Sequence, residues 1–225
     1  MEPRAPLPAG PLMAEQAPSV LIRLGQRLYD RGWLPATSGN LSARVGDRVL
    51  STGSGVDKGA MLPADLVWTD REGRVLAGSR PTSAELALHL LLYRLLPDAR
   101  CVLHAHSPAA TLCARRFLDQ GHASPMILSG WEIQKAIEGV RSHTDTLRLP
   151  VVANDQDVPR LAAAVERVLS PMSHAWLIAG HGIYAWGRDP AAAFRHLEAW
   201  EYLLSLHATL PAPTAPPRRR EPHAR

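Results

Sequence analysis

Hydrophobic residues recur every three or four positions near the start of the chain, and this pattern predicts a helix over residues 19–31. The stripe includes Val20, Leu24 and Leu28, which would share one face of the helix. Gly32 follows and can adopt the left-handed conformation that often ends a helix. We therefore expect an amphipathic helix whose apolar face packs on a sheet.

Short runs of alternating or fully apolar residues follow, separated by Gly, Asp and Asn, and such runs are typical of strands. They predict strands over residues 41–45, 48–51, 66–69 and 74–77. Because the runs are short and closely spaced, we expect them to form an antiparallel meander.

The second half of the chain alternates between helical and strand patterns. Helices are predicted over residues 82–96, from Pro108 onward, and over 131–138, 158–169 and 190–208. Strands are predicted over residues 101–106, 175–179 and 183–186. Ser107 and Asp189 precede two of the helices and can cap them. Together the elements predict an α/β fold with three layers, α/β/α, and no internal repeat.

The length and composition indicate one globular domain. With 225 residues and 46% hydrophobic content, the chain can bury one substantial core. We expect a flexible segment over residues 1–18, a domain over 19–210, and a disordered Pro- and Arg-rich tail over 211–225. The start of the chain lacks the apolar run of an export signal. No run of about eighteen apolar residues suits a membrane span, so we expect a cytoplasmic protein with no membrane partner.

The formal net charge of +4 raises the question of a nucleic-acid partner. The excess comes from the tail, where Arg218, Arg219, Arg220 and Arg225 stand among prolines and alanines. The rest of the chain is near neutral, so we expect no nucleic-acid partner. The two cysteines are too few for a disulfide framework, which favours a reducing compartment.

Two histidines end a run of strand-forming residues. His104 and His106 are two positions apart, and the two-residue period of a strand places both imidazoles on one face. His181 lies between Gly180 and Gly182, where bulky neighbours are absent and a ligand can approach. Three histidine ligands leave an open coordination position, as in catalytic zinc sites. Taken alone, the pair is more typical of a strand end, and His181 is equally typical of a tight turn.

The remaining histidines have no partner at metal-ligand spacing, so we expect them at the surface or at an interface. They are His89, His122, His143, His174, His196, His207 and His223.

Two small, polar segments are candidates for binding an anion. They are Ser38–Ser42, which is Ser-Gly-Asn-Leu-Ser, and Ser51–Gly55, which is Ser-Thr-Gly-Ser-Gly, with Lys58 close behind. Backbone N–H groups in such loops can surround an anion. Each segment alone is more often a simple turn.

The candidate segments follow one another in a characteristic order. The order is the Ser-Gly-Asn-Leu-Ser loop, the Ser54-Gly55 turn, Pro81-Thr82-Ser83-Ala84-Glu85, the His104/His106 pair and His181-Gly182. This order resembles that of the class II aldolases, such as the fuculose- and ribulose-phosphate aldolases, over residues 19–210. The resemblance implies a class II aldolase-like three-layer α/β/α domain with a central, mainly antiparallel sheet.

The same resemblance implies a site and a substrate class. One Zn²⁺ per subunit is expected on His104, His106 and His181. The phosphate of a sugar phosphate is expected near Asn40, Ser54, Gly55 and Ser83. Lys58 is added as a candidate because it lies close behind the second of the two anion-binding segments. The family also implies a homotetramer with active sites near subunit interfaces.

Two glutamates compete for the role of acid and base. Glu85 stands three residues after Thr82, which is the spacing of a capping box, yet its place also resembles the catalytic glutamate of the aldolases. Glu132 begins a helical pattern, where an acid favours the helix dipole. Its segment resembles the "QE-I-K" stretch of the methylthioribulose-1-phosphate dehydratases, with Trp131 in place of Gln. We predict Glu132 as the main proton-transfer group and keep Glu85 as the second catalytic candidate.

Two further stretches favour the dehydratase branch. Residues 154–159, Asn-Asp-Gln-Asp-Val-Pro, and 183–187, Ile-Tyr-Ala-Trp-Gly, resemble segments of the dehydratases. The branch implies zinc-dependent dehydration of 5-methylthioribulose 1-phosphate to 2,3-diketo-5-methylthiopentyl 1-phosphate in methionine salvage. The first alternative is a class II sugar-phosphate aldolase, which would split a carbon–carbon bond. The second is a metal-free scaffold like the adducin heads, against which the retained histidines and Glu132 argue.

Overall fold

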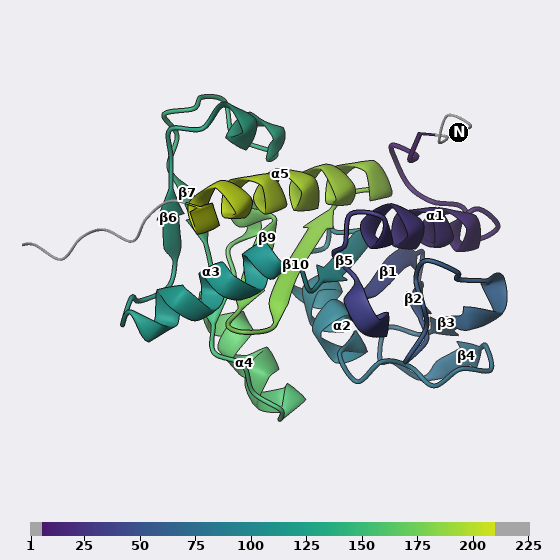
Figure 1. Cartoon of the computed structure of the whole chain (residues 1–225). Helices are drawn as coiled ribbons and strands as arrows, with labels where there is room; N and C mark the ends of the chain where they lie inside the picture. The colour runs from purple at the N-terminus through teal and green to yellow at the C-terminus, as the bar shows by residue number, and fades with distance from the viewer. Residues whose placement is uncertain (1–5, 210–225) are drawn as a thin grey trace, which may run out of the picture.

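The computed structural model describes residues 6–209, and its centre is one eight-stranded sheet (Figure 1). The strand order is β4-β3-β2-β1-β5-β10-β9-β8, and every pair is antiparallel except β8 with β9. The strands are β1 (Asn40–Val45), β2 (Arg48–Thr52), β3 (Leu66–Thr69), β4 (Val75–Ala77), β5 (Cys101–Ala105), β8 (Val151–Val152), β9 (Ala175–Ile178) and β10 (Gly182–Gly187). The predicted antiparallel meander is thus one half of this sheet.

Helices cover both faces of the sheet, as the predicted three layers require. The α-helices are α1 (Ala17–Tyr29), α2 (Leu86–Leu95), α3 (Pro108–Asp119), α4 (Val158–Val168) and α5 (Pro190–Thr209). The core on one face holds apolar side chains of α1, α3 and α5, and the core on the other holds those of α2 and α4. Within the described range, no helix is long and apolar enough to cross a membrane.

The alternation of side chains along β5 divides the two cores. Cys101, Leu103 and Ala105 belong to the core under α1, α3 and α5. Val102 belongs to the other core, and the period of two sends His104 to that same face. The metal-ligand candidate therefore lies on the α2 and α4 side of the sheet, at the end of a central strand.

Several predicted boundaries were close and two were wrong. Ser107 and Asp189 cap α3 and α5 as predicted, because their side chains accept hydrogen bonds from Ala110 and Ala192. The helix expected from Thr82 begins only at Leu86, because Thr82 forms a bridge with Gly53, which follows β2.

The second wrong boundary concerns the helix expected over residues 131–138. It is a short 3-10 helix, η3 (Glu132–Ala136). The pattern also missed a small separate hairpin, β6 (Met126–Leu128) with β7 (Leu147–Leu149). Three-residue strands are too short to show a period.

The N-terminal segment expected to be flexible lies against the body wherever the structure describes it. Leu12 is buried in the core, and the Gly10 amide donates to the Asp189 carboxylate over 3.0 Å. The Ala191 amide donates to the Pro8 carbonyl oxygen. These contacts place residues 8–12 beside the start of α5. The tail expected over residues 211–225 is outside the described range.

Candidate metal centre and active site

A row of paired side chains crosses four neighbouring strands of the sheet. Asn40 of β1 is paired with His104 of β5, His104 with Tyr184 of β10, and Tyr184 with Trp176 of β9. Paired residues in neighbouring strands point to the same face. Tyr184 stacks on the His104 ring with 3.9 Å between ring centroids and on Trp176 with 4.6 Å. This aromatic stack restrains the orientation of the His104 ring.

Two glycines let the chain come close enough to His104 to complete the site. A Cβ at Gly182, directly after His181, would overlap the carbonyl oxygen of Ala105. A Cβ at Gly39, before Asn40, would overlap the carbonyl oxygen of His104, and Gly39 has a φ of +71° that favours glycine. The β9–β10 turn and the β1 loop therefore flank the end of β5 at backbone contact distance.

The three predicted histidine ligands converge. The Nε2 atoms of His104 and His106 are 2.8 Å apart, those of His104 and His181 are 3.2 Å apart, and those of His106 and His181 are 3.1 Å apart. His106 follows the last residue of β5 rather than lying within it. The structure thus brings together the three histidines that the sequence analysis named as candidate ligands.

Hydrogen bonding shows which ring atoms are available as ligands. The Nδ1 atom of His104 is 3.0 Å from the Ile183 carbonyl oxygen, which can only accept, so Nδ1 carries the proton. The Nε2 atom of a neutral His104 is then a bare lone pair aimed at two other imidazole nitrogens. Such an arrangement is repulsive unless a proton or a cation lies between the nitrogens.

Glu85 completes the cluster. Its Oε1 lies 3.0 Å from His181 Nε2, and its Oε2 lies 3.4 Å from His104 Nε2. Asn40 Nδ2 donates to Oε2 over 2.8 Å. The capping-box interpretation is wrong, because the Glu85 side chain makes no cap bond and points to the histidines instead. The aldolase-like interpretation of this residue is the one the geometry supports.

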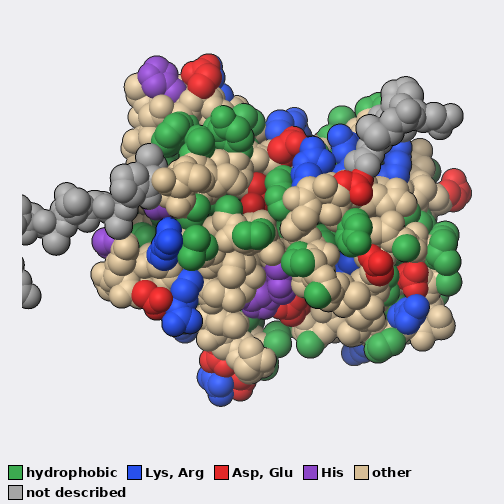
Figure 2. Space-filling view, viewed as in Figure 1, with side chains coloured by type: hydrophobic (Ala, Val, Ile, Leu, Met, Phe, Trp, Pro, Cys, Tyr) green, Lys and Arg blue, Asp and Glu red, His purple; other side chains and the backbone are tan. Residues whose placement is uncertain are grey.

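The donor set fits a small cation. One ligand atom from each of Glu85, His104, His106 and His181 lies within 4.8 Å of every other. Tetrahedral zinc with Zn–N bonds of about 2.0–2.1 Å separates its ligand nitrogens by about 3.3 Å. The observed separations of 2.8–3.2 Å need only a slight expansion. Figure 2 shows histidine and acidic side chains together at the surface near the centre of this face, so the site is open to solvent.

The charge states suit metal binding near neutral pH. Burial lowers the pKa of His104 well below its usual range and that of His106 to about 4, so both rings are neutral ligands at pH 7. Burial by itself raises the pKa of Glu85, but the hydrogen bonds from His181 and Asn40 and the electrostatic attraction of the neighbouring imidazoles outweigh it. The pKa of Glu85 is lowered to about 2, so the carboxylate is ionised.

The predicted phosphate residues divide into two groups. Asn40 and Ser83 lie beside the cluster, since Asn40 Nδ2 is 3.4 Å from Ser83 Oγ as well as bonded to Glu85. Ser54 and Gly55 are exposed just beyond the end of β2, where the Ser54 amide donates to the Pro81 carbonyl oxygen. The bridge between Gly53 and Thr82 links the end of β2 to the segment that carries Ser83 and Glu85.

Lys58 is buried rather than exposed to an incoming anion. Its side chain is 2% exposed, and its ammonium donates to the Thr37 carbonyl oxygen. Ala36 and Thr37 have φ angles of 51° and 63°, which non-glycine residues adopt at a cost of about 1 kcal/mol or more each. Burial lowers the pKa of Lys58 to about 8. The bond helps to hold the strained loop that leads into Asn40.

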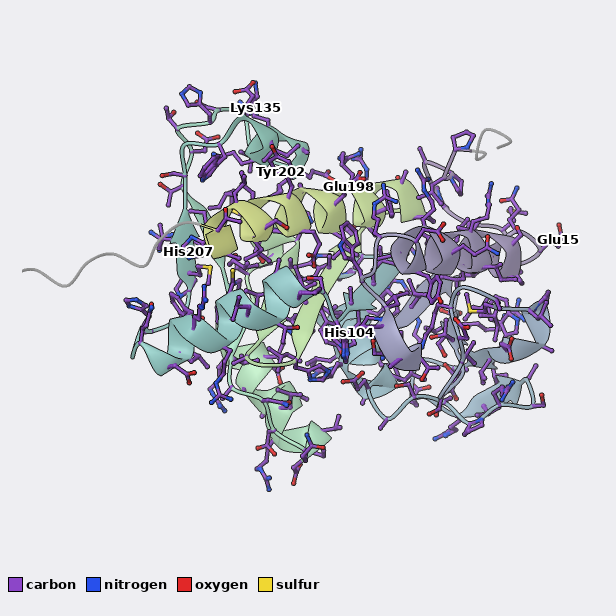
Figure 3. All side chains as sticks on the ribbon, viewed as in Figure 1. Glu15, His104, Lys135, Glu198, Tyr202 and His207 are labelled. Atoms are coloured by element: carbon purple, nitrogen blue, oxygen red, sulfur yellow. The ribbon has the colours of Figure 1, made fainter. Side chains whose placement is uncertain are left out.

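Glu132 lies apart from the cluster in the single chain. Its side chain is 72% exposed and forms an ion pair with Lys135, three residues along η3. Figure 3 shows Lys135 and His104 on opposite sides of α5. The segment is nevertheless anchored, because the buried Gln134 donates to the carbonyl oxygens of Ser142 and Asp145 over 2.8 and 2.7 Å. The sequence predicted both glutamates, and the fold brings only Glu85 to the histidines.

Two histidines expected at the surface are buried. His196 donates from Nδ1 to the Trp186 carbonyl oxygen and accepts at Nε2 from the Glu138 amide, so both its nitrogens are satisfied. His89 is 1% exposed and bonds through Nδ1 to Ser42 Oγ. The expectation for these two was wrong, because metal-ligand spacing says nothing about burial.

Sequence reasoning did not single out Tyr184, which fixes the His104 ring. The signal was present, since Tyr184 alternates with Ile183 and Ala185 in an apolar run, but its pairing partner is 80 positions away and invisible in a local pattern.

A separate cavity of about 870 Å³ lies at the other end of β10. It is lined by residues that include Leu96, Arg100, Trp186 and Arg188. None of the predicted site residues lines it, so it is distinct from the histidine cluster.

Residues 19–208 match the family model described as the class II aldolase and adducin N-terminal domain. Two curated relatives are named methylthioribulose-1-phosphate dehydratase. The protein of Methylococcus capsulatus is 46% identical over 193 residues, which cover 84% of this chain and 92% of the relative. The protein of Sorangium cellulosum is 47% identical over 189 residues, which cover 82% of this chain and 87% of the relative.

Solved structures show the same fold. An L-fuculose 1-phosphate aldolase superimposes with a TM-score of 0.73 at 26% identity and covers 88% of this chain and 87% of its own.

Proposed function

The chain belongs to the class II aldolase and adducin family, and on that premise we propose that it dehydrates 5-methylthioribulose 1-phosphate to 2,3-diketo-5-methylthiopentyl 1-phosphate. One observation carries the proposal: three imidazole nitrogens and one carboxylate converge at an open site in a chain whose curated relatives carry the dehydratase name. The role in methionine salvage follows from the same name.

The proposed cofactor is one Zn²⁺ per chain, held by His104, His106 and His181, with the Glu85 carboxylate beside it. Nitrogen ligands favour zinc over magnesium or calcium. When bound, the ion would supply Lewis-acid chemistry, which polarises a carbonyl group and makes the neighbouring carbon acid stronger.

The protein's own groups would bind and orient the substrate. Asn40 and Ser83 are placed to donate to a phosphate beside the cluster, and their loops connect to Ser54 and Gly55. Lys58 adds positive charge behind the Thr37 loop. Phosphate contacts take no part in bond breaking, but their binding energy can hold the reacting carbons in place.

Dehydration needs a group that takes the proton from C3 and returns it to the C4 hydroxyl as water departs. Glu132 stays our proposal for that group. In the single chain it is exposed on an anchored segment, so it can reach a substrate at the histidines only from a second copy of the chain. We therefore propose a homotetramer in which η3 of one subunit closes the site of its neighbour.

Product analysis tests the proposal directly. The zinc-loaded protein is incubated with 5-methylthioribulose 1-phosphate, and the products are followed by NMR. We expect loss of one water with the carbon skeleton intact. Two shorter fragments, one of them dihydroxyacetone phosphate or an aldehyde, would instead identify an aldolase, and an unchanged substrate would contradict both.

A class II aldolase is the second candidate, and the position of Glu85 is the observation that favours it. The carboxylate lies within the cluster, where the resemblance to aldolases places a catalytic glutamate. The similarity to the fuculose-phosphate aldolase is 26%, against 46% and 47% to the dehydratases, which is why we place dehydration first.

We also propose that the protein works in the cytoplasm. Cys101 and Cys113 are free and buried, which agrees with a reducing compartment. Fractionation of the source cells would test this location.

A further inference from the structure

Helix α2 faces β1 with polar side chains along its whole length. Glu85, His89 and Tyr93 are spaced four residues apart, so they lie on one face of the helix. His89 and Tyr93 are buried, at 1% and 6% exposed. A buried helix face normally carries apolar residues, because an unpaired polar group inside a protein costs free energy. The buried polar groups on this face therefore need hydrogen-bonding partners.

The partners are alternate residues of β1. Asn40, Ser42 and Arg44 are all buried, while Leu41 and Ala43 between them belong to the core on the opposite face. The two-residue period of the strand places the three polar side chains under α2.

Four polar contacts, from three residues of β1, connect the two elements in order. Asn40 Nδ2 donates to Glu85 Oε2 over 2.8 Å. Ser42 Oγ lies 2.7 Å from His89 Nδ1 and 2.8 Å from Tyr93 Oη. Arg44 donates to the Tyr93 carbonyl oxygen over 3.3 Å. We call this set of contacts the polar ladder.

The spacing of the polar ladder explains why it can set the position of the helix. Four residues of α-helix rise about 6 Å, and two residues of strand advance about 6.6 Å. Successive contacts therefore stay in register. Apolar packing has no direction and tolerates sliding, whereas hydrogen bonds of this length do not. A slide of α2 along β1 would break all four contacts together and would withdraw Glu85 from the histidines.

His89 is the middle member and joins the ladder to the metal ligands. Its pKa is lowered by burial to about 4, so the ring is neutral at pH 7. With Nδ1 as acceptor, the hydroxyl of Tyr93 donates to Ser42 and that of Ser42 donates to His89, which gives both hydroxyl hydrogens an acceptor. The Nε2 atom of His89 has no hydrogen-bond partner within the described residues. The His89 ring also meets the Tyr184 ring edge-on at 5.5 Å, and Tyr184 stacks on His104.

We propose that His89 is a positioning residue: it holds α2 in register on β1 and thereby holds the Glu85 carboxylate against His104 and His181. Its effect on turnover rests on the proposed function. Its effect on metal binding does not, because the geometry of the cluster is independent of the substrate.

The test compares His89→Phe in two backgrounds. Phenylalanine keeps the ring volume but removes both nitrogens, so Ser42 loses its acceptor. Zinc affinity is measured by competition with a chromogenic chelator in the wild type and in Glu85→Gln. We expect His89→Phe to weaken zinc binding about tenfold in the wild type, the lower end of the range for outer-shell partners of metal ligands. In Glu85→Gln the same change should matter less than about twofold, because the group it positions is already lost.

Equal losses in the two backgrounds would overturn the proposal, and so would no loss in either. The matched control is Leu88→Val, which loosens α2 in the same core without touching a polar contact. Thermal unfolding is recorded for every variant. If Leu88→Val lowers stability as much as His89→Phe and also weakens zinc binding as much, general loosening is the cause and His89 has no special part.

Two further variants keep the test decisive if His89→Phe folds poorly. His89→Asn places an amide oxygen near the position of Nδ1, so it should recover most of the zinc affinity. Tyr93→Phe removes a single hydroxyl at the far end and should weaken zinc binding slightly, again only when Glu85 is present. Failure of both patterns contradicts the ladder. In turnover assays at saturating zinc, His89→Phe should lower kcat and leave KM nearly unchanged. A chain that acts on another substrate would still give the zinc result.

Discussion

The regions around Glu85 and around Glu132 differ in how each glutamate is held. Glu85 is fixed by residues distant in sequence: Asn40 from β1, His104 from β5 and His181 from the β9–β10 turn. Glu132 contacts Lys135 three residues away and is otherwise exposed. Both glutamates stand at the start of a helical pattern, so the sequence alone gives them similar surroundings.

The difference shows that a candidate acid or base must be judged by the side chains that surround it in the folded chain. Around Glu85, hydrogen bonds from His181 and Asn40 and the electrostatic effect of His104 and His181 stabilise the ionised carboxylate. Around Glu132 the backbone is anchored by a hydrogen bond of the Gln134 side chain, while the Glu132 side chain points outward. The first region gathers four groups that could hold a metal ion. The second is, in our proposal, one side of a subunit interface.

The largest expected effect comes from removing a ligand at the complete region. His106→Ala takes away one of three converging nitrogens, and the shortened set should lose most of its zinc and reduce turnover by more than about 1,000-fold. Zinc content is measured by atomic absorption on purified protein, alongside the rate. Full zinc occupancy and full activity in this variant would place the metal elsewhere.

Glu132→Gln should give the next largest effect. If Glu132 transfers the proton, the amide keeps its size but cannot accept a proton, so kcat should fall about 100- to 10,000-fold with zinc content unchanged. Subunit mixing sharpens the comparison. Inactive His106→Ala and inactive Glu132→Gln chains should regain activity when assembled together, because one neighbour supplies the intact histidines and the other the intact glutamate. No recovery, despite mixed assembly, would mean that Glu132 does not act across an interface.

Glu85→Gln should act mainly on the metal. The glutamine can still accept from Asn40, so the fold should persist, but the charge beside the histidines is lost. We expect zinc affinity to fall about 10- to 100-fold and the rate at saturating zinc to fall less than in Glu132→Gln. Were Glu85→Gln inactive at full zinc while Glu132→Gln stayed active, the base would be Glu85 and the site would work in the manner of the aldolases.

The smallest effect concerns pH and separates the buried region from the exposed one. The pKa of His89 is about 4 in the folded protein, against 6.5 for a free side chain, so the folded state binds this proton more weakly than the unfolded state. Stability must then fall as the pH drops from 6.5 towards 4. For the zinc-free protein we expect His89 to contribute a loss of about 1 kcal/mol at pH 5.5.

Urea denaturation of the zinc-free protein between pH 7 and 5 measures this loss. His89→Asn should reduce the pH dependence, and Glu132→Gln should leave it nearly as it is, because the Glu132 side chain is mostly exposed. An equal pH dependence in His89→Asn and the wild type would show that His89 does not titrate as the burial implies.

Local pattern was enough for most elements but failed where the chain departs from it. The helix over residues 190–208 and its Asp189 cap were found, because a long helix-forming run and a capping side chain are both local signals. The start of α2 was placed four residues early, because Thr82 forms a bridge with Gly53 and residues 84–85 form a turn before the helix. Tertiary contact overrode the local preference there.

The sequence by itself determined which residues could form the site: the His104 and His106 spacing, His181 between glycines, and both glutamates. It also determined the class of fold, because hydrophobic periods are local and survive without the rest of the molecule. Only the tertiary structure decided that Glu85 faces the histidines and that Glu132 faces outward, since both outcomes depend on pairing between distant strands. The burial of His89 belongs to the same class, because its partner Ser42 is 47 positions away. No period along the chain encodes a contact across that distance.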